Sequence, residues 1–232
     1  MIVLGIDTAL KSCSAAILDG GRALAERRLA LDKGHAEHLA PLVVEALASA
    51  KVAVADLDRV GVVIGPGGFA GVRVGLAFAR GLALGTRLNV VGVTSLEALA
   101  ASSPPLRGGE FPPHMIAAVI DARRGQVYAA LYADGAVMLA PFVASPDEAR
   151  RRILAAASSA CVIVGDGATL IDPDQEHFAR IIADEIDPKV VARLAAAAPE
   201  PSAPPAPLYL RPPDAKPPKP SRFEALFNED AP

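Results

Sequence analysis

The first apolar run of the chain ends in residue types that could bind a metal ion and a phosphate. In Gly5-Ile6-Asp7-Thr8-Ala9, a carboxylate and a hydroxyl follow at the end of an expected strand. Such a pair can lie beside a metal ion and a nucleotide phosphate, although aspartate is also a common turn residue. Lys11 and Ser12 stand where a glycine-rich phosphate hairpin would be expected. We therefore predict a vestigial nucleotide site, with weak or no affinity for nucleotide.

A glycine-rich segment spans residues 65–73, with the sequence Gly-Pro-Gly-Gly-Phe-Ala-Gly-Val-Arg. Backbone N–H groups at a helix start can hold an anion, but the Gly-Lys-Ser/Thr ending of a Walker motif is missing. The glycines permit a tight turn from strand to helix, and Gly71, Gly75 and Ala79 leave one helix face flat. We favour packing over phosphate contact. The predicted vestigial nucleotide site comprises Asp7, Thr8, Lys11, Ser12, Gly65 and Gly67.

The histidines do not form a metal-binding pattern. Zinc on one helical face usually takes ligands at i and i+4, and Leu39 occupies that position after His35. His35 and His38 have no evident third ligand, and a metal ion needs several. His114 and His177 stand alone in the sequence. We predict no metal site.

Four hydroxyl residues and one polar turn are the remaining candidates for catalytic residues. Ser12, Ser14, Thr94 and Ser95 lie outside any Gly-x-Ser-x-Gly elbow. The polar turn at 121–126 contains Asp121, Arg123, Arg124 and Gln126. It could contact a phosphate, a partner or only solvent, and solvent is the default. The residues themselves predict no catalytic centre.

Short strands and helices are expected to position these segments. Apolar runs bounded by turn residues predict strands at 2–7, 13–18, 22–29, 59–64 and 89–94. Apolar residues at helical spacing predict helices at 35–50, 70–85 and 95–101. Gly71, Gly75 and Ala79 make the second helix flat, so the first two helices are also a plausible interaction surface and could form half of a four-helix bundle.

The second half of the chain repeats the first in weaker form. Ala15 lies eight residues after Asp7, and Ala129 lies eight residues after Asp121. A helical pattern at 146–157 follows in the second half. Two further matched segments are 62–67 and 162–167. The repeat predicts a duplicated α/β fold, in which two ribonuclease-H-like lobes each contain a mixed sheet.

Turn residues and prolines suggest a division into three parts. We expect an N-terminal lobe over 1–110, a smaller C-terminal lobe over 111–211, and a proline-rich tail over 212–232. Ten prolines in residues 199–220 exclude a helix or a central strand there. Within this stretch, the apolar residues of 207–211 could dock on the body.

Composition excludes several classes of function. The chain has 232 residues, 52% hydrophobic side chains, no Trp and a net charge of −3. It can therefore bury a core, but it has no overall basic field for nucleic acid and few stacking platforms. Cys13 and Cys161 are expected to be buried free thiols. The run before Asp7 lacks a basic start and is too short for a signal peptide or a membrane span, so we expect a cytoplasmic protein.

Several of these motifs together resemble one family. They are Ile6-Asp7-Thr8, Cys13-Ser14, Gly34-His35-Ala36-Glu37-His38-Leu39-Ala40-Pro41, the glycine segment 65–75, Thr94-Ser95-Leu96-Glu97-Ala98-Leu99, Asp121-Ala122-Arg123 and Gly165-Asp166-Gly167. The chain resembles the bacterial TsaB proteins, also called YeaZ, densely over 1–135 and again at 207–211. The resemblance implies the actin-like ATPase fold. It also implies a subunit of the machinery that makes N6-threonylcarbamoyladenosine at position 37 of tRNAs that read ANN codons.

The resemblance further implies partners and an interface. The expected partners are the catalytic subunit TsaD and the small ATPase TsaE, with tRNA contacted indirectly through the complex and homodimers possible when TsaD is absent. The chain itself would be a non-catalytic scaffold, since Leu39 stands where the catalytic paralogue has the second histidine of a His-x-x-x-His metal site. Gly68 and Ala70 replace two hydroxyl residues that are typical of the family. The residues expected at the interface with TsaD are His35, Leu39, Leu42, Val43, Ala46, Gly71, Val72, Gly75, Leu76 and Ala79.

Two other interpretations compete with the scaffold. In an ATP-dependent enzyme of the same fold, the turns at Asp7, Gly65 and Gly165 would surround a nucleotide, which requires real affinity for ATP. A peptidase would need a metal ion or a nucleophile, and neither is visible in the sequence. For the scaffold we expect no cofactor, with weak or interface-shared ATP or ADP left open.

Overall fold

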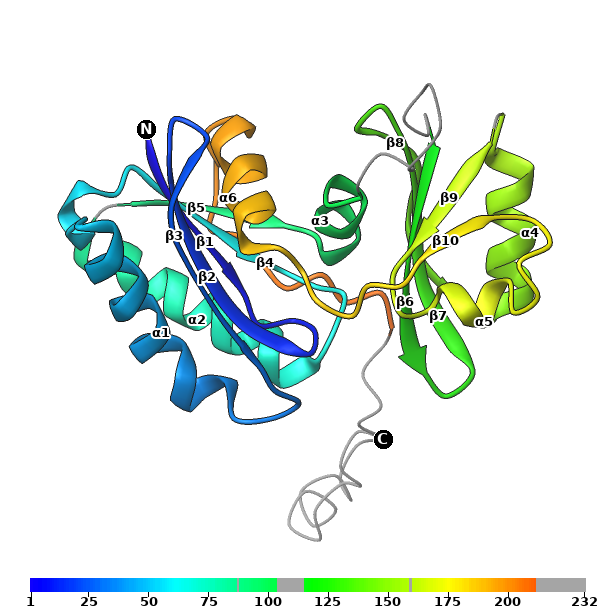
Figure 1. Cartoon of the computed structure of the whole chain (residues 1–232), viewed down its shortest axis with the longest axis horizontal. Helices are drawn as coiled ribbons and strands as arrows, with labels where there is room; N and C mark the ends of the chain where they lie inside the picture. Colours follow the sequence, from blue (N-terminus) through cyan, green and yellow to red (C-terminus); the bar gives the residue numbers. More distant parts are fainter. Residues whose placement is uncertain (87, 104–114, 159, 212–232) are drawn as a thin grey trace, which may run out of the picture.

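Two five-stranded mixed sheets stand side by side in the computed structural model, which describes residues 1–86, 88–103, 115–158 and 160–211 (Figure 1). The first sheet has the order β3-β2-β1-β4-β5, and the second has the order β8-β7-β6-β9-β10. In each sheet, an antiparallel meander of three strands is followed by two parallel strands. The predicted duplication of ribonuclease-H-like lobes is therefore confirmed.

The elements of the first lobe follow apolar periodicity closely. The strands are β1 Ile2–Asp7, β2 Ser12–Asp19, β3 Arg22–Ala30, β4 Arg59–Val63 and β5 Asn89–Val93. The helices are α1 His35–Ala50, α2 Phe69–Thr86 and α3 Ser95–Ala101, with a short 3-10 turn at Val54–Asp56. Each predicted element is present, and the bounds of α1 and α3 match the prediction. The α3 helix begins where the Thr94 hydroxyl accepts the Glu97 N–H (3.1 Å).

The second lobe repeats this order over a shorter span. Its strands are β6 Met115–Arg123, β7 Gln126–Ala133, β8 Ala136–Ala144, β9 Cys161–Val164 and β10 Ala179–Ile181. Its helices are α4 Pro146–Ala156 and α5 Ala168–Ile171, and α6 Pro188–Ala197 follows. The first hairpin of each lobe differs by one residue in register. Asp7 pairs with Ser14, whereas Asp121 pairs with Val127 because a bulge follows Asp121.

Helices cover both faces of the first sheet. Helices α1 and α2 pack on one face, and α6 returns from the second lobe to pack on the other face (Figure 1). The backbone of α6 comes so close to β1 and β4 that a Cβ on Gly5 or Gly61 would overlap it. Although α6 lies within the predicted C-terminal part 111–211, it belongs to the packing of the first sheet. Whether the chain divides into folding units at residues 110 and 211 stays a prediction.

One hydrophobic core connects the two lobes. The inward face of the second sheet, including Ala118, Ile120 and Tyr132, packs in the same cluster as Ile6 and Val62 of the first sheet. Helix α3 lies between the sheets and contacts β6 and β7. The outward face of the second sheet forms a separate cluster under α4 and α5. The lobes are therefore held together by buried apolar contacts.

Two further sequence predictions can be compared with this fold. Cys13 and Cys161 are buried and free, as predicted. Residues 200–211, which we call the strap, dock on the body: the Leu208 N–H donates to the Ile64 carbonyl at 2.8 Å. The tail predicted over 212–232 lies outside the described residues. No helix in the described part of the chain is long and apolar enough to cross a membrane.

Candidate functional site: the interlobe cleft

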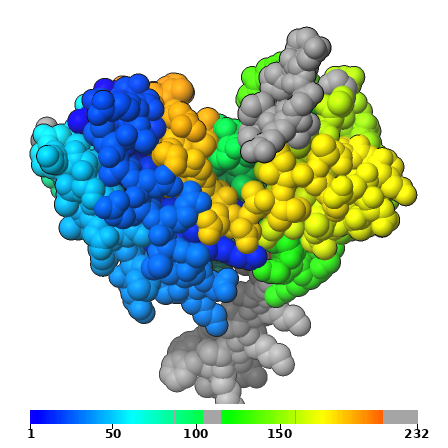
Figure 2. Space-filling model, in the orientation of Figure 1, coloured from blue at the N-terminus to red at the C-terminus, as the bar shows by residue number. Residues whose placement is uncertain are grey.

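A cleft of about 820 Å³ lies between the lobes. Most of its lining comes from four segments: the β1–β2 turn, the start of α2, the end of β6 with its turn, and the strap. Among the lining residues are Leu10, Lys11, Asp32, Gly67, Phe69, Val72, Arg73, Ile120, Asp121, Arg123, Tyr128, Asp166, Asp184, Leu208, Tyr209 and Arg211. Such a volume is typical of small-molecule sites. Figure 2 shows the two lobes and the chain segment between β10 and α6 that crosses from one to the other.

Asp7 lies behind the wall of the cleft. Its side chain is fully buried, and its Oδ1 accepts the Ala9 N–H at 2.9 Å. The Ser12 hydroxyl lies 3.5 Å from Oδ2. Burial raises the pKa of Asp7 to about 7, against the opposing effect of the Ala9 hydrogen bond. The residue is absent from the cleft lining, so its carboxyl group serves the β1–β2 turn.

The glycines of α2 bring the helix against this turn. The Thr8 hydroxyl donates to the Gly71 carbonyl at 2.7 Å. A Cβ on Gly71 would overlap the Thr8 carbonyl oxygen, and a Cβ on Gly75 would lie 2.6 Å from the Thr8 hydroxyl oxygen. A Cβ on Gly67 would overlap the Ala9 carbonyl oxygen. This geometry supports the packing interpretation of the glycine segment.

The predicted vestigial nucleotide residues divide into two groups. Lys11 and Gly67 line the cleft, whereas Asp7, Thr8 and Ser12 are buried next to it. The Lys11 ammonium group forms an ion pair with the Asp184 carboxylate at 3.3 Å. Asp184 lies in the segment that connects β10 to α6. Gly65, with φ +94°, faces the Leu208 carbonyl of the strap. The structure thus brings these six residues near one turn, but it does not direct all of them into one site.

The second lobe contributes an acidic and basic turn to the opposite wall. Asp121 accepts the Arg123 N–H at 2.7 Å and pairs with the Arg123 guanidinium at 2.9 Å. Asp166 accepts the Asp121 N–H at 2.9 Å. Burial raises the pKa of Asp166, although the hydrogen bond from Asp121 opposes this change. The carboxylates of Asp121 and Asp166 are thus already hydrogen-bonded within the second lobe.

An aromatic and cationic cluster stands at the start of α2. The Arg73 guanidinium carbon lies 3.3 Å from the centroid of the Phe69 ring and 5.5 Å from that of Tyr209. The two rings lie 5.7 Å apart. Sequence reasoning missed this cluster. The spacing of Phe69 and Arg73 at i and i+4 was a local signal, but Tyr209 comes from the far end of the chain.

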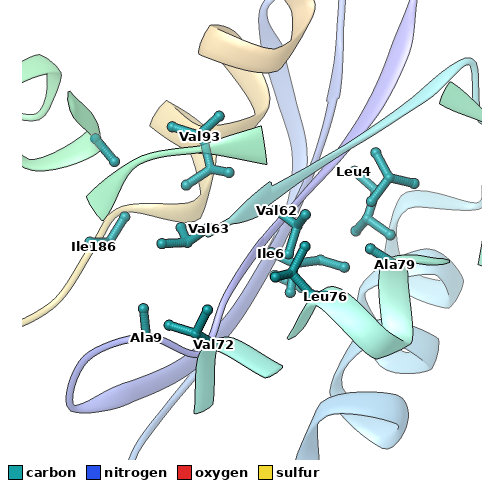
Figure 3. Packing of buried hydrophobic residues seen from close by; sticks show 14 of the residues in the cluster. Leu4, Ile6, Ala9, Val62, Val63, Val72, Leu76, Ala79, Val93 and Ile186 are labelled. Carbon is teal, nitrogen blue, oxygen red and sulfur yellow. The ribbon is translucent and has the colours of Figure 1, made fainter. Parts of the chain in front are cut away.

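The predicted partner interface requires a correction. Leu39, Leu42, Val43 and Ala46 of α1 are buried, and so are Gly71, Val72, Gly75, Leu76 and Ala79 of α2. In Figure 3, Leu76 and Ala79 lie near Leu4, Ile6 and Val62, and Val72 lies beside Ala9. Only His35 among the ten predicted residues is partly exposed. Nine of the ten therefore face the sheet, and the prediction chose the wrong side of the two helices.

The outward side of α1 and α2 carries exposed apolar residues instead. Val44 is 64% exposed and Leu84 is 90% exposed. Ala77 and the charged Arg80 are exposed too. Whether this surface binds a partner stays a prediction. Among the described residues, no group of three or more His, Cys, Asp or Glu side chains could hold a metal ion.

Comparison with known proteins places the chain in a family. Residues 29–145 match the family model described as TsaD, tRNA N6-adenosine threonylcarbamoyltransferase. The chain is 38% identical over 227 residues to an uncharacterized protein of Mycobacterium leprae, across 93% of this chain and 56% of that protein. It is 36% identical over 132 residues to the tRNA threonylcarbamoyladenosine biosynthesis protein TsaB of Escherichia coli, across 57% of this chain and 55% of TsaB.

A solved structure agrees with these matches. An uncharacterized Pseudomonas aeruginosa protein, described as similar to the peptidase YeaZ, superposes with a TM-score of 0.75 at 28% identity. The superposition covers 90% of this chain and 99% of that protein. By contrast, the chain spans only about half the length of the two sequence relatives described above.

Proposed function

Since the chain belongs to the TsaB (YeaZ) family, we propose that it is a non-catalytic scaffold subunit in the synthesis of N6-threonylcarbamoyladenosine on tRNA. It forms a heterodimer with the threonylcarbamoyltransferase subunit TsaD, in the cytoplasm. The ATPase TsaE joins the same complex, and tRNA is contacted through the complex rather than by this chain alone. The surface that binds TsaD also permits a homodimer of this chain when TsaD is absent.

One observation carries the non-catalytic part of this proposal. The carboxyl group of Asp7, which ends the first strand, is fully buried and absent from the cleft lining. A carboxylate must be ionised and accessible to hold a metal ion with a nucleotide. Burial raises the pKa of Asp7 to about 7, so a large share of the side chain is neutral near neutral pH. The burial of Asp7 thus supports a scaffold over an ATP-dependent enzyme of this fold.

The outward side of α1 and α2 supports the partner-binding part. The two helices contact each other and lie on the outer face of the first sheet. Val44 and Leu84 are large apolar side chains left in solvent, and small residues such as Ala48, Ala77 and Gly81 are exposed beside them. Two helices with small outward residues can pack closely against a second helix pair. Exposed apolar residues on such a face are typical of interaction sites.

A reconstituted modification reaction tests the proposal. Purified TsaD, TsaE, this chain and unmodified tRNA are incubated with ATP and a donor of the threonylcarbamoyl group. The modified nucleoside is then measured by mass spectrometry. Omission of the chain should abolish the product, and Asp7→Asn should restore it to within about twofold of wild type. Asp121→Asn, at the matching position of the second lobe, is the control.

The outcomes separate the scaffold from the enzyme. Loss of modification in Asp7→Asn, with an unchanged circular dichroism spectrum and an intact complex with TsaD, would give Asp7 a chemical role and contradict the proposal. ATP hydrolysis by the isolated chain, abolished by Asp7→Asn, would favour the competing ATP-dependent enzyme.

A further inference from the structure

A second groove lies at the end of α2 that is remote from the interlobe cleft. It has a volume of about 710 Å³ and is bounded by the last turns of α2, the start of β5 and the first part of the strap. Among the described residues, none lines both this groove and the cleft. We call it the outer groove. Its lining is mostly apolar and includes Ala83, Leu84, Leu88, Val90, Ala203 and Pro204.

The strap runs beside α2 in the opposite direction. At the start of the helix, the Tyr209 ring lies 5.7 Å from the Phe69 ring. Further along the helix, the Arg80 guanidinium group donates to the Pro205 carbonyl. Near the helix end, Leu84 lines the outer groove together with residues 201–204 of the strap. The outer groove is therefore an open part of one long contact between the strap and α2.

The longer polar side chains of the outer groove hold the strap. Arg80 donates to the Pro205 carbonyl, and the Asn89 amide group donates to the Glu200 carboxylate at 2.9 Å. The rest of the lining consists of Ala, Leu, Val and Pro residues and one Ser. Such a surface suits the apolar side chains of a protein better than a charged or sugar-like ligand, which needs several convergent polar groups.

The surface around the outer groove exposes apolar atoms and carries little charge. Leu84 is 90% exposed, the highest value among the exposed large apolar side chains of the described residues. Residues 201–210 of the strap contain no charged side chain, and Ala203 and Pro204 are exposed. Depletion of charge together with exposed apolar residues is typical of the centre of a protein interface. The prolines also make the strap stiff, so binding would order it at little entropic cost.

The outer groove is continuous with the outward side of α1 and α2. Ala77 and Leu84 are seven residues apart, so they lie on the same side of α2. Arg80 lies between them in the sequence, one helical turn from each, and it binds the strap. A protein that packs on the outward side of the two helices therefore also reaches Leu84 and the first part of the strap.

We propose that the outer groove receives an apolar side chain of the subunit that packs on the outward side of α1 and α2, so that the strap forms part of the heterodimer interface. The inference rests on the proposed function, because that function assigns the outward side to TsaD. Leu84 and Pro204 form the two walls between which the side chain inserts. Arg80 and Asn89 act as positioning residues, because their hydrogen bonds hold the strap wall in place.

Calorimetric titration of TsaD with wild type and two strap variants tests this proposal. Ala203→Glu and Ala206→Glu each place a carboxylate at an exposed alanine of the strap, but only Ala203 lines the outer groove. Ala203→Glu should raise the dissociation constant about tenfold or more, because the charge would be buried in an apolar contact. Ala206→Glu is the matched control and should stay within about twofold of wild type.

A third variant changes the helix wall of the outer groove and leaves the strap intact. Leu84→Ala shortens an exposed side chain and should raise the dissociation constant about fivefold or more, as for loss of an apolar interface contact. Hydrogen exchange at the Leu208 amide, which bonds to the Ile64 carbonyl, shows whether the strap stays docked in each variant. If Ala203→Glu releases the strap, the result for Leu84→Ala decides.

The outcomes separate failure of the outer groove from failure of the scaffold. If wild type forms no complex with TsaD, the proposed function fails and this proposal fails with it. If Val44→Glu with Ala77→Glu abolishes the complex while Ala203→Glu and Leu84→Ala bind like wild type, the scaffold stands and only the outer groove is excluded. Equal weakening by Ala203→Glu and Ala206→Glu would show a general effect of charge on the strap and would also overturn the proposal.

Discussion

Asp7 and Asp121 occupy the same place in the two lobes but differ in their surroundings. Asp7 ends β1 and Asp121 lies two residues before the end of β6, and each accepts the N–H of the residue two positions later, at 2.9 Å and 2.7 Å. Asp7 is fully buried, whereas the Asp121 side chain is 23% exposed and pairs with Arg123. The two lobes therefore share this local hydrogen bond, although a bulge follows Asp121 only. The use of the carboxyl group has diverged, because α2 closes over the first turn while the second opens to the cleft.

Replacing each of the two aspartates by asparagine should give the largest difference between the lobes in the free energy of unfolding. Burial raises the pKa of Asp7 from 3.8 to about 7, so the native state holds its proton more tightly than the unfolded state. This contribution to stability is complete below pH 3.8 and is lost as pH rises towards 7. A shift of this size corresponds to about 4 kcal/mol. Asp7→Asn, which mimics the neutral acid, should therefore exceed wild type in stability by about that amount above pH 7.

Urea unfolding from pH 4 to pH 8 measures this difference. The stability gained by Asp7→Asn should grow between pH 4 and pH 7 and then level off. Asp121→Asn loses a partly exposed pair with Arg123 and should change the free energy of unfolding by less than about 1 kcal/mol at each pH. A flat difference for Asp7→Asn would mean that the Asp7 carboxyl is hydrated in solution.

A methyl group at the contact between α2 and the β1–β2 turn should have the next largest effect on the free energy of unfolding. Gly71→Ala would bring a Cβ onto the Thr8 carbonyl oxygen, and neither backbone can move freely. We expect a loss of about 3 kcal/mol in the free energy of unfolding. Gly81→Ala is the control on the same helix, where nothing lies within 4 Å of the new Cβ. There we expect a gain of about 0.5 to 1 kcal/mol, and equal effects at the two sites would contradict the packing account.

The strap should show a smaller difference between its two attachments. On the second lobe, Arg211 donates to Gln126, and on the first lobe, Arg80 donates to the Pro205 carbonyl. Arg211→Ala should cost about 1 kcal/mol and raise hydrogen exchange near residue 211 only. The Leu208 amide, which bonds to Ile64, should stay protected. Loss of that protection in Arg211→Ala would show that the strap is released as one unit.

The elements and the duplication could be predicted because they depend on local patterns. The spacing of Leu39, Val43 and Ala46 marks α1, and the pairing of strands follows their apolar runs. The same periodicity marks the apolar side of each helix, and this side is the one buried against the sheet. The prediction assigned that side to a partner, because the resemblance implied an interface on these helices without indicating which side forms it.

The other features that the sequence did not predict depend on long-range contacts. The return of α6 to the first sheet depends on tertiary packing, and its only local trace is the small size of Gly5 and Gly61. The cluster of Phe69, Arg73 and Tyr209 joins the start of α2 to the strap. The burial of Asp7 depends equally on α2 closing over the turn, which a sequence motif does not encode.

Light scattering of the chain mixed with TsaD tests the scaffold account most directly. The variant Val44→Glu with Ala77→Glu adds charge to the outward side of α1 and α2, and Leu154→Glu adds it to the exposed side of α4 in the second lobe. All three positions are exposed, so the variants should fold. Wild type and Leu154→Glu should form a heterodimer, while the double variant should leave two monomers. A heterodimer that persists in the double variant, or is lost only in Leu154→Glu, would contradict the account.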